Sequence, residues 1–585
     1  MMNRYFSHLT TALVLALVCL VAHGQPALAQ DKTAQIDALL SKYHEIRQFN
    51  GSALVAENGQ VIFKKGYGHA NMEWDVPNAP DTKFRIGSVT KQFTAVLILQ
   101  LMEEGKIDLN ATITEYLPDY PKTQGDQVTI HHLLTHTSGI PSYTGLPGFM
   151  RDNTRDPYKP GEMLDVFSEM DLEFEPGAAW RYNNSGYFLL GAIIEAVTSQ
   201  PYHEVLHERI LDPLELTATG YEHNDDVIEH RADGYARTPG GFERARYLDT
   251  TIPYAAGMMY STVEDLFKWD QALHTDRIFQ SEETKTKMFT PYMNNYGYGW
   301  IIQDMSIGDT GNTTKAIRHG GGIFGFSANF VRLVDDGHVI VILDNTEGNS
   351  GAPTGGIVSI LYGEEATMPK EPISQVMRQT IEAQGVEAAA EHYRALKRDH
   401  ADVYDFAENH LNNLGYYFLG QGDTETAIAI FKLNVEAYPN AFNTYDSLGE
   451  AYMEAGDNEK AIANYKKSLE LNAGNDNGKE MLKKLGVEME DEEMTLSEEV
   501  LDRYLGVYEL RPGFEITISR EGTQLKGQAT GQPMVDLFPQ SETKFYLKVV
   551  QAQIEFHLGD GGVAESLTLF QGGGEMNAPR VEEGS

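Results

Sequence analysis

Hydrophobic residues follow two different periods between about positions 31 and 362, and together they predict a mixed α and β domain. Apolar and polar residues alternate over positions 51–67, on either side of Asn58-Gly59, which predicts a β-hairpin. Positions 326–344 show the same alternation. Positions 88–104 are apolar nearly all round and precede Gly105, so we expect a buried helix that ends there.

From about 370 to 485 the pattern is helical and it repeats. Gly415 recurs as Gly449 and Gly422 recurs as Gly456, each 34 positions later. Small residues at this period, where paired helices would cross, resemble tetratricopeptide repeats. An ordinary pair of helical hairpins is the alternative. Because two clear copies are few, we expect the array to pack on a neighbour or to carry capping helices.

The last part of the chain changes to short alternating stretches, such as 514–519 and 524–528, which predict a small antiparallel sheet or barrel. The predicted fold class is therefore multidomain α+β: an antiparallel sheet flanked by helices, then helical repeats, then a small antiparallel β domain. The predicted segments are a signal peptide at 1–29, a first domain at 31–365, repeats at 370–486, an acidic linker at 487–499 and the β domain at 500–580.

The first 29 residues have the features of a secretory signal. Arg4 gives a positive start, positions 11–22 are apolar, and Ala27-Leu28-Ala29 fits a cleavage site. A membrane anchor is the alternative, but the apolar run is short for a bilayer. The single cysteine, Cys19, lies inside this segment, so the mature chain would have neither disulfides nor Cys-ligated metals. We expect a periplasmic or secreted protein, with no membrane span after the signal is removed.

Charge narrows the possible partners. Acidic residues outnumber basic ones by 85 to 46, for a formal net charge of −39 over 585 residues. Such a surface repels phosphate backbones and anionic headgroups, so nucleic acid and membrane-surface partners are not expected.

The start of the predicted buried helix carries a candidate nucleophile and base. In Ser88-Val89-Thr90-Lys91 the two polar side chains are three residues apart, which places them on one helix face. Burial would lower the pKa of Lys91 and leave neutral amine to accept the proton of Ser88. The alternative is that Ser88 is a plain helix N-cap. The same four-residue pattern occurs at positions 541–544, so it is not specific alone.

Two further motifs supply groups for the same chemistry. In an extended Tyr182-Asn183-Asn184 segment the first and third side chains would face the same way; the phenol could lose or relay a proton, and Asn184 could hold the lysine and a substrate carbonyl. His319-Gly320-Gly321-Gly322 comes just before an expected strand. There His319 could orient or polarise a substrate, and the N–H of Gly322 could join that of Ser88 as an oxyanion hole. A hairpin-end histidine beside a flexible loop is the alternative.

In this order the motifs resemble those of the serine β-lactamase and penicillin-binding protein superfamily, and the match is closest to the class C β-lactamase-like branch of D-aminopeptidases, D,D-peptidases, esterases and lactamases. The resemblance covers about 42–362. It implies Ser88 as the acylated nucleophile, Lys91 and Tyr182 as the acid–base pair, Asn184 as their orienting partner, and His319 to Gly321 as the strand-edge motif. True class C lactamases usually carry lysine where this chain has His319. The histidine is more frequent in the esterases and D-amino-acid peptidases.

Two other catalytic patterns are weaker. His203-Glu204-Val205-Leu206-His207 fits a zinc protease motif, but it follows Pro201 and continues the serine hydrolase resemblance. No Gly-x-Ser-x-Gly of an α/β-hydrolase occurs. We therefore expect no metal and no cofactor.

The sequence thus predicts an exported serine hydrolase that acts through an acyl-enzyme on amide or ester bonds of D-amino-acid peptides, cell-wall fragments, small esters or β-lactams. The alternative is a penicillin-binding-like sensor without turnover, or a peptide-binding protein that uses its repeats. In either case the repeats could dock a protein or peptide partner.

Overall fold

A computed structural model describes residues 25–487, 494–511, 513–532, 534–550, 552–559, 561–571 and 574–581. Most of the predicted signal peptide and part of the predicted acidic linker lie outside the described residues. The chain divides into two compact units, Met1–Arg237 with Phe242–Pro369, and Thr238–Gly241 with Lys370–Ser585.

The first unit is built on a six-stranded antiparallel sheet with the order β10-β11-β12-β13-β1-β2. Its strands are β1 (Gly51–Glu57), β2 (Gln60–Tyr67), β10 (Ile301–Ser306), β11 (Thr313–Ile323), β12 (Phe326–Leu333) and β13 (His338–Asp344). The first and last strands along the chain lie side by side, with Gly51 opposite Asp344. The hairpin β1–β2 and the four consecutive strands β10–β13, far apart in sequence, therefore form one sheet.

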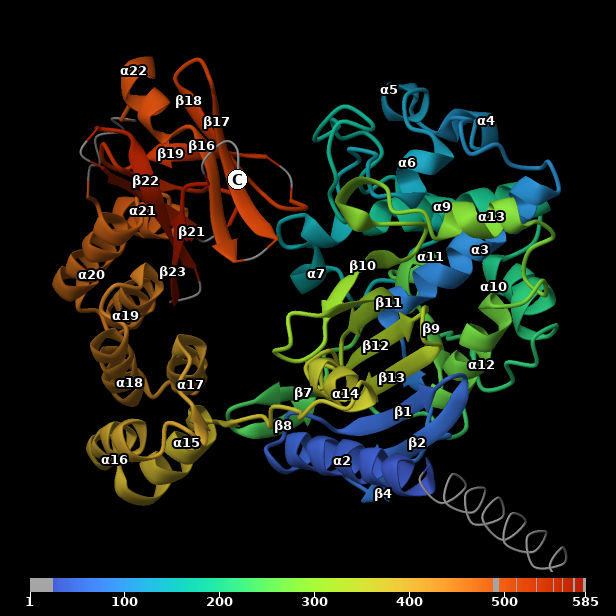
Figure 1. Ribbon diagram of the computed structural model, residues 1–585, viewed down its shortest axis with the longest axis horizontal. Coiled ribbons are helices and arrows are strands. Elements are labelled where there is room, and N and C mark those ends of the chain that lie inside the picture. Colours follow the sequence, from blue (N-terminus) through green and yellow to red (C-terminus); the bar gives the residue numbers. More distant parts are fainter. Residues whose placement is uncertain are drawn as a thin grey trace, which may run out of the picture. The chain divides into compact units, whose positions relative to one another are not determined.

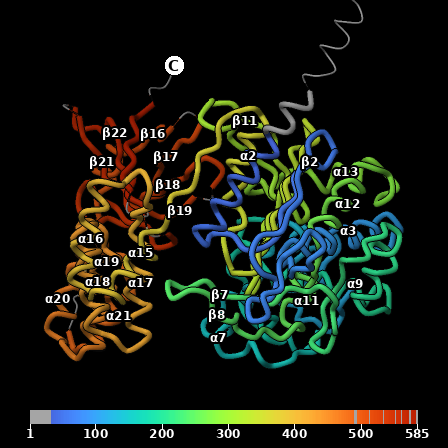
Figure 2. Tube along the Cα trace, turned by 90° about the horizontal axis from the view of Figure 1, so that it is seen from below, coloured from blue at the N-terminus to red at the C-terminus, as the bar shows by residue number. Residues whose placement is uncertain are grey.

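The central strands of this sheet are buried on both faces, whereas the edge strands β2 and β10 keep exposed residues. Successive residues of a central strand therefore pack into two different apolar clusters. In β1, Leu54 and Ala56 join one apolar cluster, whereas Ala53 and Val55 join another. Two helices cover the second face, and a larger helical layer covers the first (Figures 1 and 2). The two are α2 (Gln25–Glu45) and α14 (Thr354–Leu361); the layer includes α3 (Thr90–Glu103), α9 (Asn184–Thr198), α11 (Tyr254–Gly257) and α12 (Val263–Leu273).

Shorter elements complete the first unit. The helices are α4 (Ile113–Tyr116), α5 (Lys122–Gly125), α6 (Ile130–Leu134), α7 (Phe149–Asp152), α8 (Pro160–Leu164), α10 (Tyr202–Leu206) and α13 (Glu282–Met288). The strands are β3 (His69–Asn71), β4 (Val76–Pro77), β5 (Phe84–Arg85), β6 (Gly220–Tyr221), β7 (Tyr235–Thr238), β8 (Gly241–Arg244) and β9 (Met259–Ser261), where Thr238 and Gly241 at the ends of β7 and β8 are counted with the second unit.

The predicted apolar helix is confirmed as α3, preceded by a 3₁₀ turn at Gly87–Val89. Its side chains are buried along most of its length, and Phe93 stacks on Trp269 with ring centroids 4.3 Å apart. A helix buried on all sides holds any polar group on it away from water, and Lys91 is such a group.

The second unit begins with a chain of helices that follow one another in sequence order (Figure 1). They are α15 (Ile373–Gln384), α16 (Val386–Asp399), α17 (Glu408–Gly420), α18 (Thr424–Ala437), α19 (Phe442–Glu454), α20 (Asn458–Leu471) and α21 (Asp476–Lys484). The repeated glycines lie where helices pair: a Cβ on Gly415 would be 2.5 Å from the ring of Phe431, and one on Gly449 would be 3.1 Å from Tyr465. The 34-residue period thus reflects two equivalent helix pairs.

Eight consecutive antiparallel strands form the C-terminal β domain. They are β16 (Gly506–Arg511), β17 (Phe514–Glu521), β18 (Gln524–Ala529), β19 (Val535–Pro539), β20 (Lys544–Tyr546), β21 (Ala552–Leu558), β22 (Ala564–Gln571) and β23 (Gly574–Pro579). The first strand meets the end of the last through a bridge between Tyr508 and Arg580, so the sheet closes into a barrel. Tyr504, stacked on Phe556 at 4.5 Å, lies in its core.

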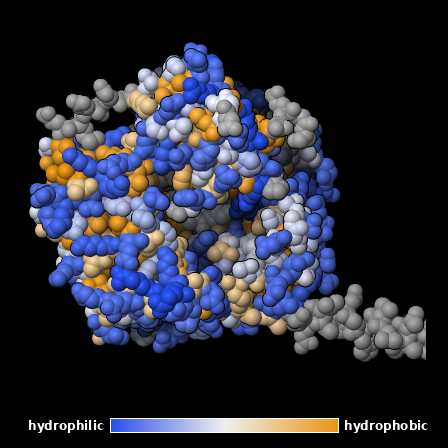
Figure 3. All heavy atoms as spheres, turned by 60° about the vertical axis from the view of Figure 1, so that its left-hand side comes forward, coloured by the Kyte–Doolittle hydropathy of each residue, from blue (hydrophilic) through white to orange (hydrophobic). Residues whose placement is uncertain are grey.

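Hydrophilic side chains cover most of the face shown in Figure 3, with hydrophobic residues in smaller groups between them. This surface agrees with the acidic composition. Within the described part of the chain, no helix combines the length and the apolar character needed to span a bilayer.

Candidate active site

Ser88 lies in the 3₁₀ turn before α3, where the turn packs directly on β11. Gly87 has φ +50, and a Cβ on it would lie 2.9 Å from the backbone N of Gly322. A Cβ on Gly321 would lie 1.9 Å from the carbonyl oxygen of Ile86. Because neither glycine leaves room for a side chain, the backbone of β11 runs in contact with the nucleophile turn. The structure therefore brings Ser88 and the glycine run together.

Lys91 lies one turn further along, with Nζ 3.0 Å from Ser88 Oγ. Nζ also donates to Asn184 Oδ1 and to the carbonyl oxygen of Ala256, each at 2.8 Å. The residue is fully buried, and this burial lowers its pKa well below the ordinary value for lysine. A neutral amine has two hydrogens and one lone pair. In its neutral form the amine would donate these hydrogens to the two acceptor oxygens, Asn184 Oδ1 and the Ala256 carbonyl, which leaves the lone pair toward the Ser88 hydroxyl, as a general base requires.

Asn184 does not lie in an extended segment, as the sequence suggested, but is the first residue of α9. The helix starts there because the Asn183 side chain accepts a hydrogen bond from the N–H of Gly186 at 2.8 Å and acts as an N-cap. Asn184 still reaches the site: Oδ1 binds Lys91, and Nδ2 donates to Thr144 Oγ1 at 2.9 Å. Thr144 thus fixes which end of the amide faces the lysine.

Tyr182 lies next to the nucleophile, and its phenol is protonated rather than ionised. The Lys91 Nζ is 4.9 Å from the centre of its ring. Burial raises the pKa of Tyr182, and a hydrogen bond with Ser88 only partly opposes this rise. The phenol therefore keeps its proton. Of the two roles expected for the phenol, losing its proton or relaying one, the raised pKa favours the relay.

His319 is inside β11, not before it, and it is not among the residues that line the cavity described below. Nδ1 donates to the carbonyl oxygen of Gly320 at 2.6 Å, so Nε2 accepts from the hydroxyl of Tyr296 at 2.9 Å. Burial lowers the pKa of His319 to about 3, with Lys91 adding to the effect. The imidazole is neutral and serves to position Tyr296 and the strand.

A cavity of about 370 Å³ opens beside the nucleophile. Three of the predicted site residues line it: Ser88, Asn184 and Gly322. Most of the other lining residues are apolar: Tyr143, Met150, Leu248, Ile252, Pro253, Ala256, Gly257, Ile323, Phe324 and Phe326. An acyl group with an apolar side chain fits such a wall.

The zinc-like motif does not form a ligand set. The helix α10 ends at Leu206, and His207 pairs with Asp212 at 3.5 Å, whereas His203 packs against His223 with ring centroids 4.7 Å apart. Across the described ranges, no group of three or more His, Cys, Asp or Glu side chains is placed to hold a metal ion.

Some contacts of the site had no sequence signal. The carbonyl oxygen of Ala256 belongs to a four-residue helix with no polar pattern, and Thr144 and Ser142 belong to a short 3₁₀ turn at Tyr143–Gly145 and its N-cap. The tyrosine and histidine cluster was also missed: His136 packs on Tyr182 at 4.3 Å and accepts a hydrogen bond from the N–H of Asn183.

Comparison with known proteins gives the class of this site. The family model named beta-lactamase matches residues 36–360, more than half of the chain, so the chain belongs to the beta-lactamase family. A tetratricopeptide repeat model matches 442–475, and a domain of unknown function (DUF3471) matches 490–580.

Relatives cover either the whole chain or its first unit. Penicillin-binding protein 4* of Bacillus subtilis is 26% identical over 582 residues, 95% of this chain and 100% of that protein. The putative penicillin-binding protein PbpX of the same organism is 31% identical over 284 residues, 48% of this chain and 69% of the relative. A solved penicillin-binding protein from Bacillus halodurans covers 55% of this chain and 98% of its own, with 27% identity and a TM-score of 0.50. EstCE1, described as a hydrolase with promiscuous acyltransferase activity, shares the fold at 21% identity, a TM-score of 0.51 and 57% and 99% coverage.

Proposed function

We propose that this protein is a serine hydrolase that cleaves amide or ester bonds through an acyl-enzyme on Ser88. The observation that supports it most is the arrangement around Lys91. Its Nζ lies 3.0 Å from Ser88 Oγ and donates hydrogen bonds to Asn184 Oδ1 and to the carbonyl oxygen of Ala256. A buried lysine with a lowered pKa is a base suited to a serine nucleophile.

The reaction follows from these contacts. Lys91 Nζ takes the proton of Ser88 as Oγ bonds to the substrate carbonyl carbon, and the N–H groups of Ser88 and Gly322 hold the oxyanion. When the bond to the leaving group breaks, the hydroxyl of Tyr182, which is hydrogen-bonded to Ser88, gives that group its proton and takes in its place the proton that Lys91 had accepted, so Lys91 is a free base again. Water then attacks the acyl carbonyl carbon, and the same groups transfer protons in the reverse order. The bond to Ser88 Oγ breaks, and Ser88 is released with its proton restored.

The proposed substrates are D-amino-acid peptides, cell-wall fragments, small esters or β-lactams, in line with the class C-like branch and with relatives named penicillin-binding proteins. We further propose that the protein is exported and acts in the periplasm or outside the cell, because positions 1–29 resemble a signal peptide. A protein or peptide partner for the helical repeats is part of the same proposal.

A substrate screen of the purified full chain tests this function. The probes are p-nitrophenyl butyrate, D-alanine p-nitroanilide and nitrocefin, together with a fluorophosphonate label, and Ser88→Ala is the control. Turnover that is lost in Ser88→Ala is the expected result. Stable labelling of Ser88 with no turnover would instead favour a penicillin-binding sensor. If Ser88 takes no label and no substrate is turned over, both the hydrolase and the sensor function are refuted.

A further inference from the structure

The cavity beside Ser88 has a carboxylate on its wall. Among the described residues that line it, Glu347 is the one with a charged side chain. It lies in the segment after β13, together with Gly348, which also lines the cavity. The mechanism above does not use this carboxylate.

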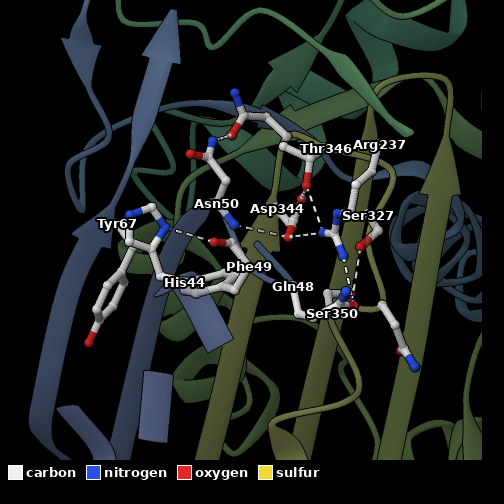
Figure 4. A network of polar contacts seen from close by, with 12 residues as sticks. His44, Gln48, Phe49, Asn50, Tyr67, Arg237, Ser327, Asp344, Thr346 and Ser350 are labelled. Atoms are coloured by element: carbon white, nitrogen blue, oxygen red, sulfur yellow. Dashed lines mark hydrogen bonds and ion pairs between the residues drawn. The ribbon is translucent and has the colours of Figure 1, made fainter. Parts of the chain in front are cut away.

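The segment that carries Glu347 is held by a buried polar network (Figure 4). The backbone N and the Oγ1 of Thr346 both donate to Asp344 Oδ1 at 2.6 Å. Arg237 Nη2 donates to Thr346 Oγ1 at 2.8 Å and lies 3.5 Å from Asp344 Oδ2. The Asp344 side chain is 0% exposed. Because the Arg237 guanidinium and the Asp344 carboxylate bind Thr346 at several points in a buried position, the start of this segment has a fixed position.

Its far end is also fixed. The backbone N of Ser350 donates to Ser327 Oγ at 3.2 Å, a contact drawn in Figure 4. A Cβ on Gly348 would lie 2.1 Å from Arg237 Nη2, so the guanidinium packs directly on the backbone next to Glu347. The segment is therefore ordered on both sides of the carboxylate.

Glu347 itself has an unusual backbone and a tethered side chain. Its φ is +49, a left-handed conformation that costs a non-glycine residue on the order of 1 kcal/mol. Its Oε1 accepts a hydrogen bond from the N–H of Gly325 at 2.7 Å, at the turn between β11 and β12. The residue is exposed, and in the described part of the chain no hydrogen bond to Oε2 is present. One oxygen anchors the carboxylate and the other is open to a ligand.

The cations near this site do not neutralise Glu347. Arg237 is bonded to Asp344 and Thr346. Lys91 is bonded to Asn184, Ala256 and Ser88, and as the neutral base of the proposed mechanism it carries no charge that could offset Glu347. Arg246 stacks on Phe324, with its guanidinium carbon 4.1 Å from the ring centre, and forms no ion pair among the described residues. His319 is neutral. A bound molecule with a positive charge would thus supply the missing partner, whereas a carboxylate at this wall would be repelled.

We propose that Glu347 is a specificity-determining residue that selects acyl donors with a protonated amino group beside an apolar side chain, such as the esters and amides of apolar amino acids with a free amine. This inference rests on the proposed hydrolase function. It adds the charge that the substrate carries and the residue that recognises it.

Paired substrates test the proposal in the full chain. The methyl esters of D- and L-phenylalanine are compared with their N-acetyl derivatives at pH 6.5, where an α-amine with an ordinary pKa of about 7.7–8.0 is protonated. The measured quantity is the ratio of kcat/KM for the free-amine ester to that for the N-acetyl ester of the same enantiomer. We expect a ratio well above one in the wild type and a fall of about 10-fold or more in Glu347→Gln, because a charge-assisted hydrogen bond is lost.

Glu365→Gln is the matched control. It removes the same charge from an exposed residue of the same unit that does not line the cavity, so the ratio should stay unchanged. Glu347→Lys should shift preference toward an N-succinyl ester, whose carboxylate would meet the new cation. The rate of fluorophosphonate labelling at Ser88 shows that each variant is folded.

Different results identify which idea fails. A ratio that stays within about twofold between wild type and Glu347→Gln would overturn the role of Glu347 while the hydrolase function stands. If the wild type hydrolyses no ester and Ser88 takes no label, the proposed function fails and this inference fails with it.

Discussion

The protonation state of His319 leads to a quantitative prediction about acid stability. Burial lowers its pKa to about 3 in the folded protein, against about 6.5 for an exposed histidine. Between these values the unfolded chain binds a proton that the folded chain does not, so the free energy of unfolding must fall as pH decreases below 6.5. The contribution is complete above pH 6.5 and is lost progressively toward pH 3.

The size of the loss follows from the pKa difference. Each pH unit in this window costs about 1.4 kcal/mol, so lowering the pH from 7 to 5 removes about 2 kcal/mol through His319. His319→Gln cannot titrate, and its loss of stability over the same range should be smaller by this amount. Removing the contact with Tyr296 lowers the stability of the variant at every pH, but that offset cancels in the comparison.

Urea unfolding followed by tryptophan fluorescence measures this difference in the full chain. All four tryptophans, Trp74, Trp180, Trp269 and Trp300, belong to the first unit, so their signal reports on the unit that contains His319. Curves are recorded at pH 7 and pH 5 for both proteins. If wild type and His319→Gln lose the same stability within about 0.5 kcal/mol, the imidazole is not held neutral, and the site would carry a cation at this position.

Two further predictions concern proton transfer and packing at the site. Tyr182→Phe should lower kcat by about 10²- to 10⁴-fold for a D-alanine alkylamide, because the amine of this substrate must be protonated to leave. The loss should be far smaller for a p-nitrophenyl ester, whose phenolate leaves unprotonated. Equal losses on both substrates would contradict a role of Tyr182 in protonating the leaving group. Gly321→Ala places a Cβ 1.9 Å from the Ile86 carbonyl oxygen, so this variant should have a lower Tm and slower labelling of Ser88. A Cβ at Gly322 meets open space, so Gly322→Ala should keep the Tm of the wild type. The reverse order of stability would show that β11 does not pack on the nucleophile turn.

Local periodicity accounts for the parts of this protein that the sequence predicted. The spacing of Ser88 and Lys91 sets them one helical turn apart, and the 34-residue period of Gly415 and Gly449 marks equivalent helix crossings. Alternation along 51–67 and 326–344 predicted strands of one antiparallel sheet. In each case a short segment contains the whole signal.

What the sequence did not predict depends on contacts between distant segments. Asn183 caps α9, so Asn184, the third residue of the Tyr182-Asn183-Asn184 motif, starts a helix. The three residues alone predict neither the cap nor the start of the helix. His319 points toward Tyr296 because of the strand register, which is set by pairing with β12. The carboxylate of Glu347 comes from a loop after β13, and that loop is placed by Arg237, more than a hundred positions earlier in the chain. No local pattern links these residues.

The central claim is that Ser88 becomes acylated with Lys91 as its base. The most direct measurement is intact-protein mass spectrometry, with peptide mapping, of samples quenched milliseconds to seconds after mixing with a p-nitrophenyl ester. We predict an acyl adduct on the peptide that contains Ser88. It should disappear as product forms, be absent from Ser88→Ala, and form far more slowly in Lys91→Ala. An adduct on another residue, or ester hydrolysis that persists unchanged in Ser88→Ala, would contradict the central claim.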